Sequence, residues 1–151
     1  MTIQVTNAQR EVTVDPSRMA RFARCAVRRL RIRTPGILAI TCLATRPMRL
    51  LNKRFCHHDR PTDVLSFRYD GTGKRLPPRM RGKRVVGEIF ISPRLAQDYA
   101  TRHRISYAEE LGRYILHGLL HWLGYDDQTG AQQRIMRLKE DRLLASCGLL
   151  L

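Results

Sequence analysis

The residues best suited to chemistry are two histidines, His117 and His121, in the segment HGLLHWLGYDD. Their spacing places both side chains on one side of a helix, a turn apart, so the two imidazoles can meet at a single point. Gly124 is a natural end for this helix, because glycine accepts the left-handed conformation with which many helices end. The chain then turns and could return either Asp126 or Asp127 to the histidines.

Two imidazoles and one carboxylate would provide three protein ligands for a metal ion. A tetrahedral Zn²⁺ held in this way keeps its fourth position for water or substrate, as catalytic zinc sites do. Histidines at this spacing can also simply lie on the polar side of a helix. Here the neighbouring residues are apolar and predict a buried helix, in which histidines need partners, and this favours the metal. Glu110 and Tyr114 share the side of the histidines and could orient an imidazole, although such residues are more often solvated.

The segment HGLLHWLGYD resembles the signature of the YbeY family, single-domain metal-dependent endoribonucleases of bacterial ribosomal RNA maturation. Residues 52–67 and 87–92 resemble two other segments of that family, in its order and spacing. The resemblance is close from Leu50 to Tyr125 and extends to both ends by pattern only. It implies an endoribonuclease that acts on ribosomal RNA of the small subunit.

The resemblance also implies a metal site formed by His117, His121 and Asp127, where the family's third ligand is a histidine. Asp127 can still bind Zn²⁺, since carboxylate oxygens are ordinary zinc ligands. A harder oxygen ligand makes Mn²⁺ or Fe²⁺ more plausible competitors. The added negative charge should leave the pKa of water on the metal higher than three neutral imidazoles would.

Arginines are the candidates for binding the substrate: Arg54, Arg60, Arg81 and Arg84. The first two are near Cys56, which stands where the family has an arginine important for activity, so that the function could have moved to them or weakened. The other two belong to residues 71–84, a stretch without period that is rich in glycine, proline and basic residues. It predicts a mobile loop that can follow a phosphate backbone.

The charge of the chain favours a polyanionic partner. Its 151 residues carry a formal net charge of +15, and phosphate neutralisation with counterion release would use this charge. A genome rich in arginine codons would produce the same surplus. No helix clearly combines a basic face with exposed aromatic residues, so we expect RNA and not a membrane surface, and no specificity for DNA.

The cellular compartment is predicted from the N-terminus and the cysteines. No signal peptide and no membrane span are recognisable, which predicts a cytoplasmic protein. The cysteines lack any Cys-x-x-Cys spacing, and all are predicted to be reduced: Cys25, Cys42, Cys56 and Cys147.

Periodicity predicts a single α+β domain over residues 1–151, in which helices pack a small mixed β-sheet around the central histidine-bearing helix. The expected order is β-α-β-α-β-β-α-α-α, with the strands at residues 3–6, 37–44, 64–67 and 85–92. The last two should pair antiparallel. Some apolar residues are expected to face the core from the second and last helices: Met48, Leu51, Phe55, Ile135, Leu138, Leu143 and Leu144.

The resulting hypothesis is a metal-dependent endoribonuclease in maturation and quality control of the small ribosomal subunit. No residue can be assigned as general base. One alternative is a non-catalytic ribosome-associated factor in which the metal only stabilises the fold. A metalloprotease is a weaker alternative, because zinc peptidases of the His-Glu-x-x-His type carry their general base where this chain has Gly118.

Overall fold

The computed structural model describes residues 1–69 and 84–148. The strands are β1 (Thr2–Ala8), β2 (Ile37–Leu43), β3 (Val64–Arg68) and β4 (Val85–Ile91). The helices are α1 (Pro16–Arg29), α2 (Thr45–Cys56), α3 (Pro93–His103), α4 (Tyr107–Trp122) and α5 (Gly130–Cys147). The predicted α+β class and the order of the elements are confirmed.

The four strands form one mixed sheet in the order β1-β2-β4-β3. β2 lies parallel to both β1 and β4, whereas β3 runs antiparallel to β4 with Val64 opposite Ile91. The antiparallel pairing of β3 with β4 is therefore as predicted. Because the sheet ends at β1 and β3, the two inner strands β2 and β4 carry most of the sheet's buried apolar side chains, including Ile40 and Ile89.

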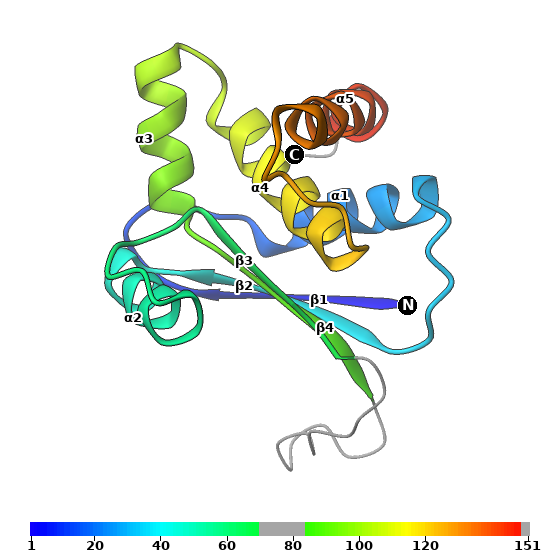
Figure 1. Ribbon diagram of the computed structural model, residues 1–151, viewed down its shortest axis with the longest axis horizontal. Coiled ribbons are helices and arrows are strands. Elements are labelled where there is room, and N and C mark those ends of the chain that lie inside the picture. The colour runs from blue at the N-terminus through cyan, green and yellow to red at the C-terminus, as the bar shows by residue number, and fades with distance from the viewer. Residues whose placement is uncertain (70–83, 149–151) are drawn as a thin grey trace.

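The helices lie unevenly on the two faces of the sheet. Figure 1 shows α1, α4 and α5 above one face and α2 beneath the other. The core fills the space between α1, α4 and the sheet, where Phe22, Ile40 and Leu116 have no exposed surface. α4 lies between the sheet and α5, and its residues from Glu110 to Leu116 are all buried. No helix in the described ranges is both long and apolar enough to cross a bilayer.

α4 approaches the sheet closely because Gly118 has no side chain. A Cβ atom at this position would overlap Cγ2 of Ile89 on β4. The backbone oxygen of Gly118 accepts a hydrogen bond of 2.9 Å from Oγ of Ser66 on β3. The turn that carries the first histidine is therefore held at a fixed height above the sheet.

Side chains cap the starts of several helices. The Asp15 side chain accepts hydrogen bonds from the backbone at the start of α1. Ser106 accepts one from the backbone of Glu109 at the start of α4, but the reciprocal bond of a full capping box is found at Thr129 and Gln132, which begin α5. This second capping box fixes where α5 begins after the turn that follows α4.

Three predicted core residues are exposed: Phe55 (50%), Ile135 (50%) and Leu138 (57%). On α2, Met48 is buried as predicted, and the other buried position belongs to Asn52, whose side chain donates to the backbone oxygen of Arg60. On α5, the buried side contains Met136, Glu140 and Leu143. The last helix is therefore rotated relative to the prediction, and a buried carboxylate takes the place expected for an aliphatic side chain.

The prediction of four reduced cysteines is wrong for one pair. Cys25 of α1 and Cys147 of α5 form a disulfide across 122 residues, with their Cα atoms 6.0 Å apart. Helix packing brings them together, and their spacing in the sequence contains no sign of it. Cys42 and Cys56 are free, and burial raises the pKa of the Cys42 thiol to about 12.

Candidate metal centre

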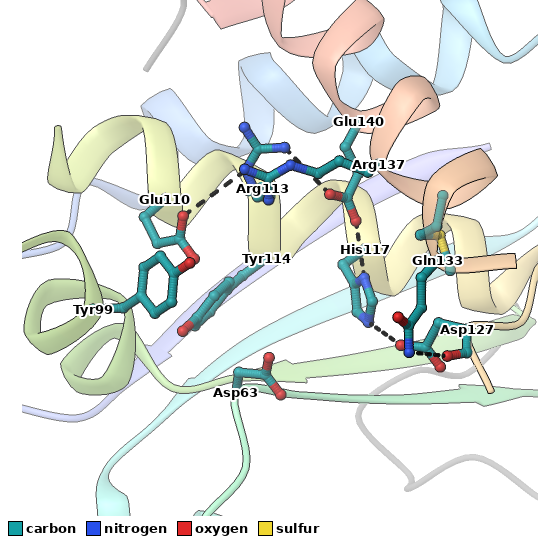
Figure 2. A pocket seen from close by; sticks show the side chains of 11 residues that line it. Asp63, Tyr99, Glu110, Arg113, Tyr114, His117, Asp127, Gln133, Arg137 and Glu140 are labelled. Carbon is teal, nitrogen blue, oxygen red and sulfur yellow. Dashed lines mark hydrogen bonds and ion pairs between the residues drawn. The ribbon is translucent and has the colours of Figure 1, made fainter. Parts of the chain in front are cut away.

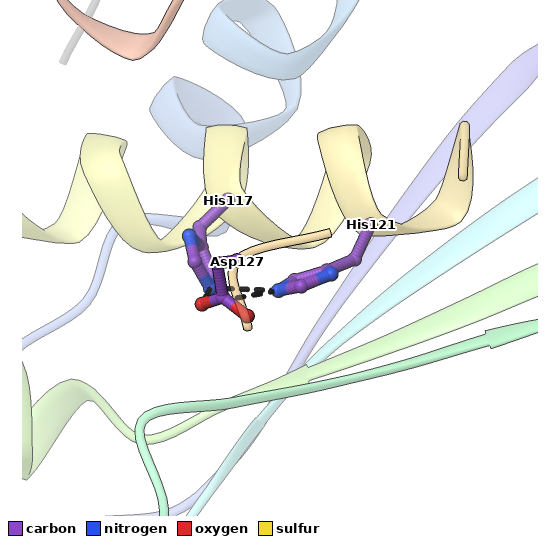
Figure 3. A group of neighbouring side chains, drawn as sticks. All are labelled: His117, His121 and Asp127. Carbon is purple, nitrogen blue, oxygen red and sulfur yellow. Dashed lines mark hydrogen bonds and ion pairs between the residues drawn. The ribbon is translucent and has the colours of Figure 1, made fainter. Parts of the chain in front are cut away.

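Three predicted ligands come together at the end of α4. One donor atom from each of His117, His121 and Asp127 lies within 4.8 Å of the others (Figure 3). The two Nε2 atoms are 2.9 Å apart, and Oδ2 of Asp127 is 3.5 Å from the first and 3.8 Å from the second. All three side chains are partly exposed, so the cluster is open on one side.

The other nitrogen of each imidazole determines which atom faces the cluster. Nδ1 of His117 lies 2.9 Å from a carboxylate oxygen of Glu140, and Nδ1 of His121 lies 3.0 Å from the backbone oxygen of Tyr125. Because these oxygens accept hydrogen bonds, each Nδ1 donates and each Nε2 presents a lone pair. Two lone pairs facing one another repel unless a proton or a metal ion lies between them. The donor set therefore fits a metal ion.

The turn after α4 selects Asp127 over Asp126, a choice that helix geometry alone left open. Gly124 has a φ of 96°, the conformation expected of a glycine that ends a helix. Asp126 is exposed, and its carboxylate accepts a hydrogen bond from the backbone of Asp127. The Asp127 backbone oxygen accepts from Gln133 of α5, which holds the turn against that helix.

A buried charged group supports His117 from behind. Glu140, which is 4% exposed, binds His117 through Oε1 and lies 3.3 Å from Arg113 Nη1 through Oε2. Arg113 also donates a hydrogen bond of 2.7 Å to Asp141. Burial lowers the pKa of His117, but the hydrogen bond to Glu140 and the negative charges of Glu140, Asp63 and Asp127 together raise it overall. We define Arg113, Glu140 and Asp141 as the buried ion group, in which Arg113 and Glu140 are buried and Asp141 is the exposed member.

A pocket of about 240 Å³ extends from this cluster along α4 (Figure 2). Its lining comes from α3, α4, α5 and the two loops beside them: Asp63, Tyr99, Glu110, Arg113, Tyr114, His117, Asp127, Gln133, Met136, Arg137 and Glu140. Arg113 and Arg137 are the cationic side chains among these lining residues. The cluster thus opens into a space large enough for part of a substrate.

The predicted substrate-binding arginines do not line this pocket. Arg54 is exposed on α2 with its guanidinium 5.5 Å from the Phe55 ring, and Arg60 is exposed in the following loop. Arg84 is exposed just before β4, while Arg81 lies outside the described residues, as do residues 71–83 of the predicted mobile loop. A role in binding RNA outside the pocket remains a prediction for all four.

Glu110 and Tyr114, expected to be solvated or to orient an imidazole, are buried (4% and 7% exposed). The residue that orients His117 is Glu140, which the sequence did not reveal because it comes from another helix. Tyr125 orients His121 through its backbone oxygen. Every residue type has this oxygen, so the sequence could not indicate the contact. The Asp63 carboxylate accepts a hydrogen bond from the Val64 backbone at the start of β3.

Comparison with known proteins identifies the family. The family model for Endoribonuclease YbeY matches residues 4–148 of this chain. The chain belongs to the YbeY family. An Endoribonuclease YbeY of Thermobifida fusca is 34% identical over 145 residues, covering 96% of this chain and 93% of the relative. One of Chlorobaculum tepidum is 31% identical over 144 residues, covering 95% and 96%.

A solved structure agrees with the YbeY-family fold. The solution structure of a Thermotoga maritima protein superposes with a TM-score of 0.63 over 96% of this chain and 88% of that one. The two sequences are 21% identical, so this likeness concerns the fold alone.

Proposed function

We propose that this YbeY-family endoribonuclease cleaves phosphodiesters of ribosomal RNA in maturation and quality control of the small subunit, with one divalent metal ion held by His117, His121 and Asp127. The observation that carries the proposal is the pair of Nε2 lone pairs 2.9 Å apart beside a carboxylate, at the edge of a pocket. The substrate class comes from the family, and the ligand positions come from this chain.

The proposed ion is Zn²⁺, with Mn²⁺ and Fe²⁺ as competitors because Asp127 provides an oxygen ligand. When bound, such an ion supplies a Lewis acid that polarises a phosphoryl oxygen and makes water more acidic. Glu140 and the Tyr125 backbone orient the two imidazoles by their Nδ1 atoms. Arg137, at the pocket's edge, is placed to balance negative charge on the phosphoryl oxygens during cleavage.

The shape of the cluster favours catalysis over a purely structural metal. Structural zinc sites have four protein ligands and are closed, whereas this cluster offers three and borders a pocket. The metalloprotease alternative lacks a base, because Gly118 occupies the position of the peptidase glutamate.

The nuclease proposal is tested on structured ribosomal RNA with added metal ions. The parent should cleave it, and His117→Ala and His121→Ala should fall to the level without enzyme. His58→Ala is the matched control, since His58 lies exposed in the loop after α2 and should leave cleavage unchanged. Equal cleavage by the parent and both ligand variants would point to a contaminating nuclease. Elemental analysis of the purified protein identifies the ion, and folded ligand variants would argue against a structural metal.

Binding of RNA through the basic surface is a separate part of the proposal. With a net charge of +15, affinity should fall steeply as salt increases, because binding releases counterions. Titration at several salt concentrations measures this slope. A flat response would mean that the arginine content serves no phosphate contact.

A ribosomal substrate places the proposed activity in the cytoplasm, where thiols are normally kept reduced. The Cys25–Cys147 disulfide conflicts with such a location, because a reducing compartment favours free thiols. Alkylation of thiols in rapidly acidified cells, followed by mass spectrometry, determines its state. Full oxidation in the cell would contradict a reducing compartment.

A further inference from the structure

The pocket has a second end, away from the metal ligands. There the rings of Tyr99 and Tyr114 lie near the carboxylates of Glu110 and Asp63 (Figure 2). The metal-site chemistry uses none of these four side chains. Because they line the same space as His117, anything bound among them lies beside the metal centre.

Glu110 is unsatisfied in a way that points to a ligand. Its side chain is 5% exposed, and its buried Oε2 atom has no hydrogen-bond partner within the described part of the chain. The nearest cation, Nε of Arg113, is 3.8 Å away and equally without a hydrogen-bond partner. Buried carboxylate oxygens are almost always hydrogen-bonded, so this one lacks a donor that a ligand could bring.

The charges of this end balance one another and do not select a phosphate as that ligand. The carboxylates of Glu110 and Asp63 lie in a pocket that Arg113 and Arg137 also line, so this end has no surplus of positive charge for an anion. They do not form a second metal-binding group, because the only such group among the described residues is that of His117, His121 and Asp127. A neutral, planar molecule with N–H donors fits best, since tyrosine rings stack with bases and carboxylates accept hydrogen bonds.

The distance of this end from the histidines matches the reach of one nucleotide. Glu110 precedes His117 by two helical turns, which is about 10 Å along α4 at the usual rise and comparable to the reach of one nucleotide. The whole pocket has about 240 Å³, below the usual range for drug-sized ligands and suited to a single ring system.

We propose that this end of the pocket binds one guanine base next to the cleaved phosphodiester, and that Glu110 determines the specificity for it. Guanine presents N1–H and an N2 amino group side by side, which match the two oxygens of a carboxylate. Adenine and cytosine present one amino group beside an acceptor, and uracil one N–H between two acceptors. The position relative to the cut rests on the proposed function, but recognition of the base does not.

The test measures binding to metal-free protein, so that it does not depend on cleavage. Fluorescence anisotropy compares short uridine-rich RNAs that contain one guanine or, in its place, one inosine, which lacks the N2 amino group. The parent should prefer guanine by roughly tenfold, as a paired base contact predicts. Glu110→Gln should lose this preference. Glu109→Gln is the matched control, because it removes the same charge from an exposed side chain one position earlier.

Equal affinity of the parent for both RNAs would overturn the proposal, and so would an unchanged preference in Glu110→Gln. Circular dichroism verifies that this variant is folded. If it is not, Tyr99→Leu provides the second test. Removing the stacking ring should lower the affinity for the guanine RNA and the inosine RNA alike, by several-fold. Unaltered binding by that variant also contradicts the proposal. A guanine preference without cleavage under any metal would reject the nuclease and retain the base site.

Discussion

Two groups of charged side chains have similar distances and very different surroundings. In the buried ion group, Arg113 lies 3.3 Å from Glu140 and 2.7 Å from Asp141, and the Arg113 and Glu140 side chains are 9% and 5% exposed. On the other side of the sheet, Arg49 lies 2.8 Å from Asp59, and that arginine side chain is 54% exposed. Lys53 adds a second contact to Asp59 at 2.9 Å. We define Arg49, Lys53 and Asp59 as the exposed ion group.

The difference shows that burial, and not distance, decides what an ion pair does. Water screens the exposed group, and pairs of this kind contribute little to stability. Breaking a buried pair leaves a desolvated charge without its partner, which is costly. The buried ion group also contacts His117, so that its geometry orients one of the proposed metal ligands.

Removing the central cation should have the largest effect. Arg113→Met leaves Glu140 buried without its guanidinium, and we expect the free energy of unfolding to fall by about 3 kcal/mol or more. Urea unfolding followed by circular dichroism measures this change. Arg49→Met is the matched control in the exposed ion group and should shift the midpoint far less. Equal losses in the two variants would mean that burial does not distinguish the groups.

The Cys25–Cys147 disulfide joins the end of α5, the helix that carries Glu140, to α1. Removing this bond tests how much a covalent contact contributes beside the ion pairs. Replacing Cys25 and Cys147 together by alanine should lower the free energy of unfolding by about 2–4 kcal/mol, because the unfolded chain loses a long closed loop. The parent measured with reductant should behave like the double variant. Identical unfolding of parent and variant without reductant would show that the bond does not form.

Removing the charge of Glu140 tests whether the buried ion group serves the metal. Glu140→Gln keeps the shape but weakens the contact to Nδ1 of His117, and metal affinity should fall by roughly 10- to 100-fold. Competition with a chromogenic chelator provides the affinity. Asp141→Asn is the control, since Asp141 binds Arg113 as Glu140 does. A comparable loss in the control would assign the effect to the whole ion group and not to the histidine contact.

The smallest effect is expected for Asp59→Asn. Hydrogen bonds from Arg49 and then Lys53 lower the pKa of Asp59 to about 2. A lowered carboxyl pKa stabilises the folded protein above the ordinary value and loses this effect as the pH falls towards 2. Thermal unfolding should therefore differ slightly between parent and variant at neutral pH, and the difference should vanish on acidification. A difference that grows in acid would contradict this assignment.

Local spacing made the centre of the site predictable, and tertiary packing hid the rest. The four-residue spacing of His117 and His121 and the helix-ending Gly124 depend only on helix geometry, which the sequence displays. Glu140 approaches from another helix, 23 positions from His117, and no periodicity reports such a contact. The inner face predicted for its helix was also partly wrong, because Ile135 and Leu138 are exposed while Leu143 is buried as expected.

Gly118 has a consequence for how such an enzyme can change. Because a side chain there would meet Ile89 and Val64, a glutamate cannot simply be added beside the first histidine. A glutamate at this position would first require smaller side chains on the sheet beneath the helix. The close contact between α4 and β4 therefore keeps out the residue that zinc peptidases use as general base.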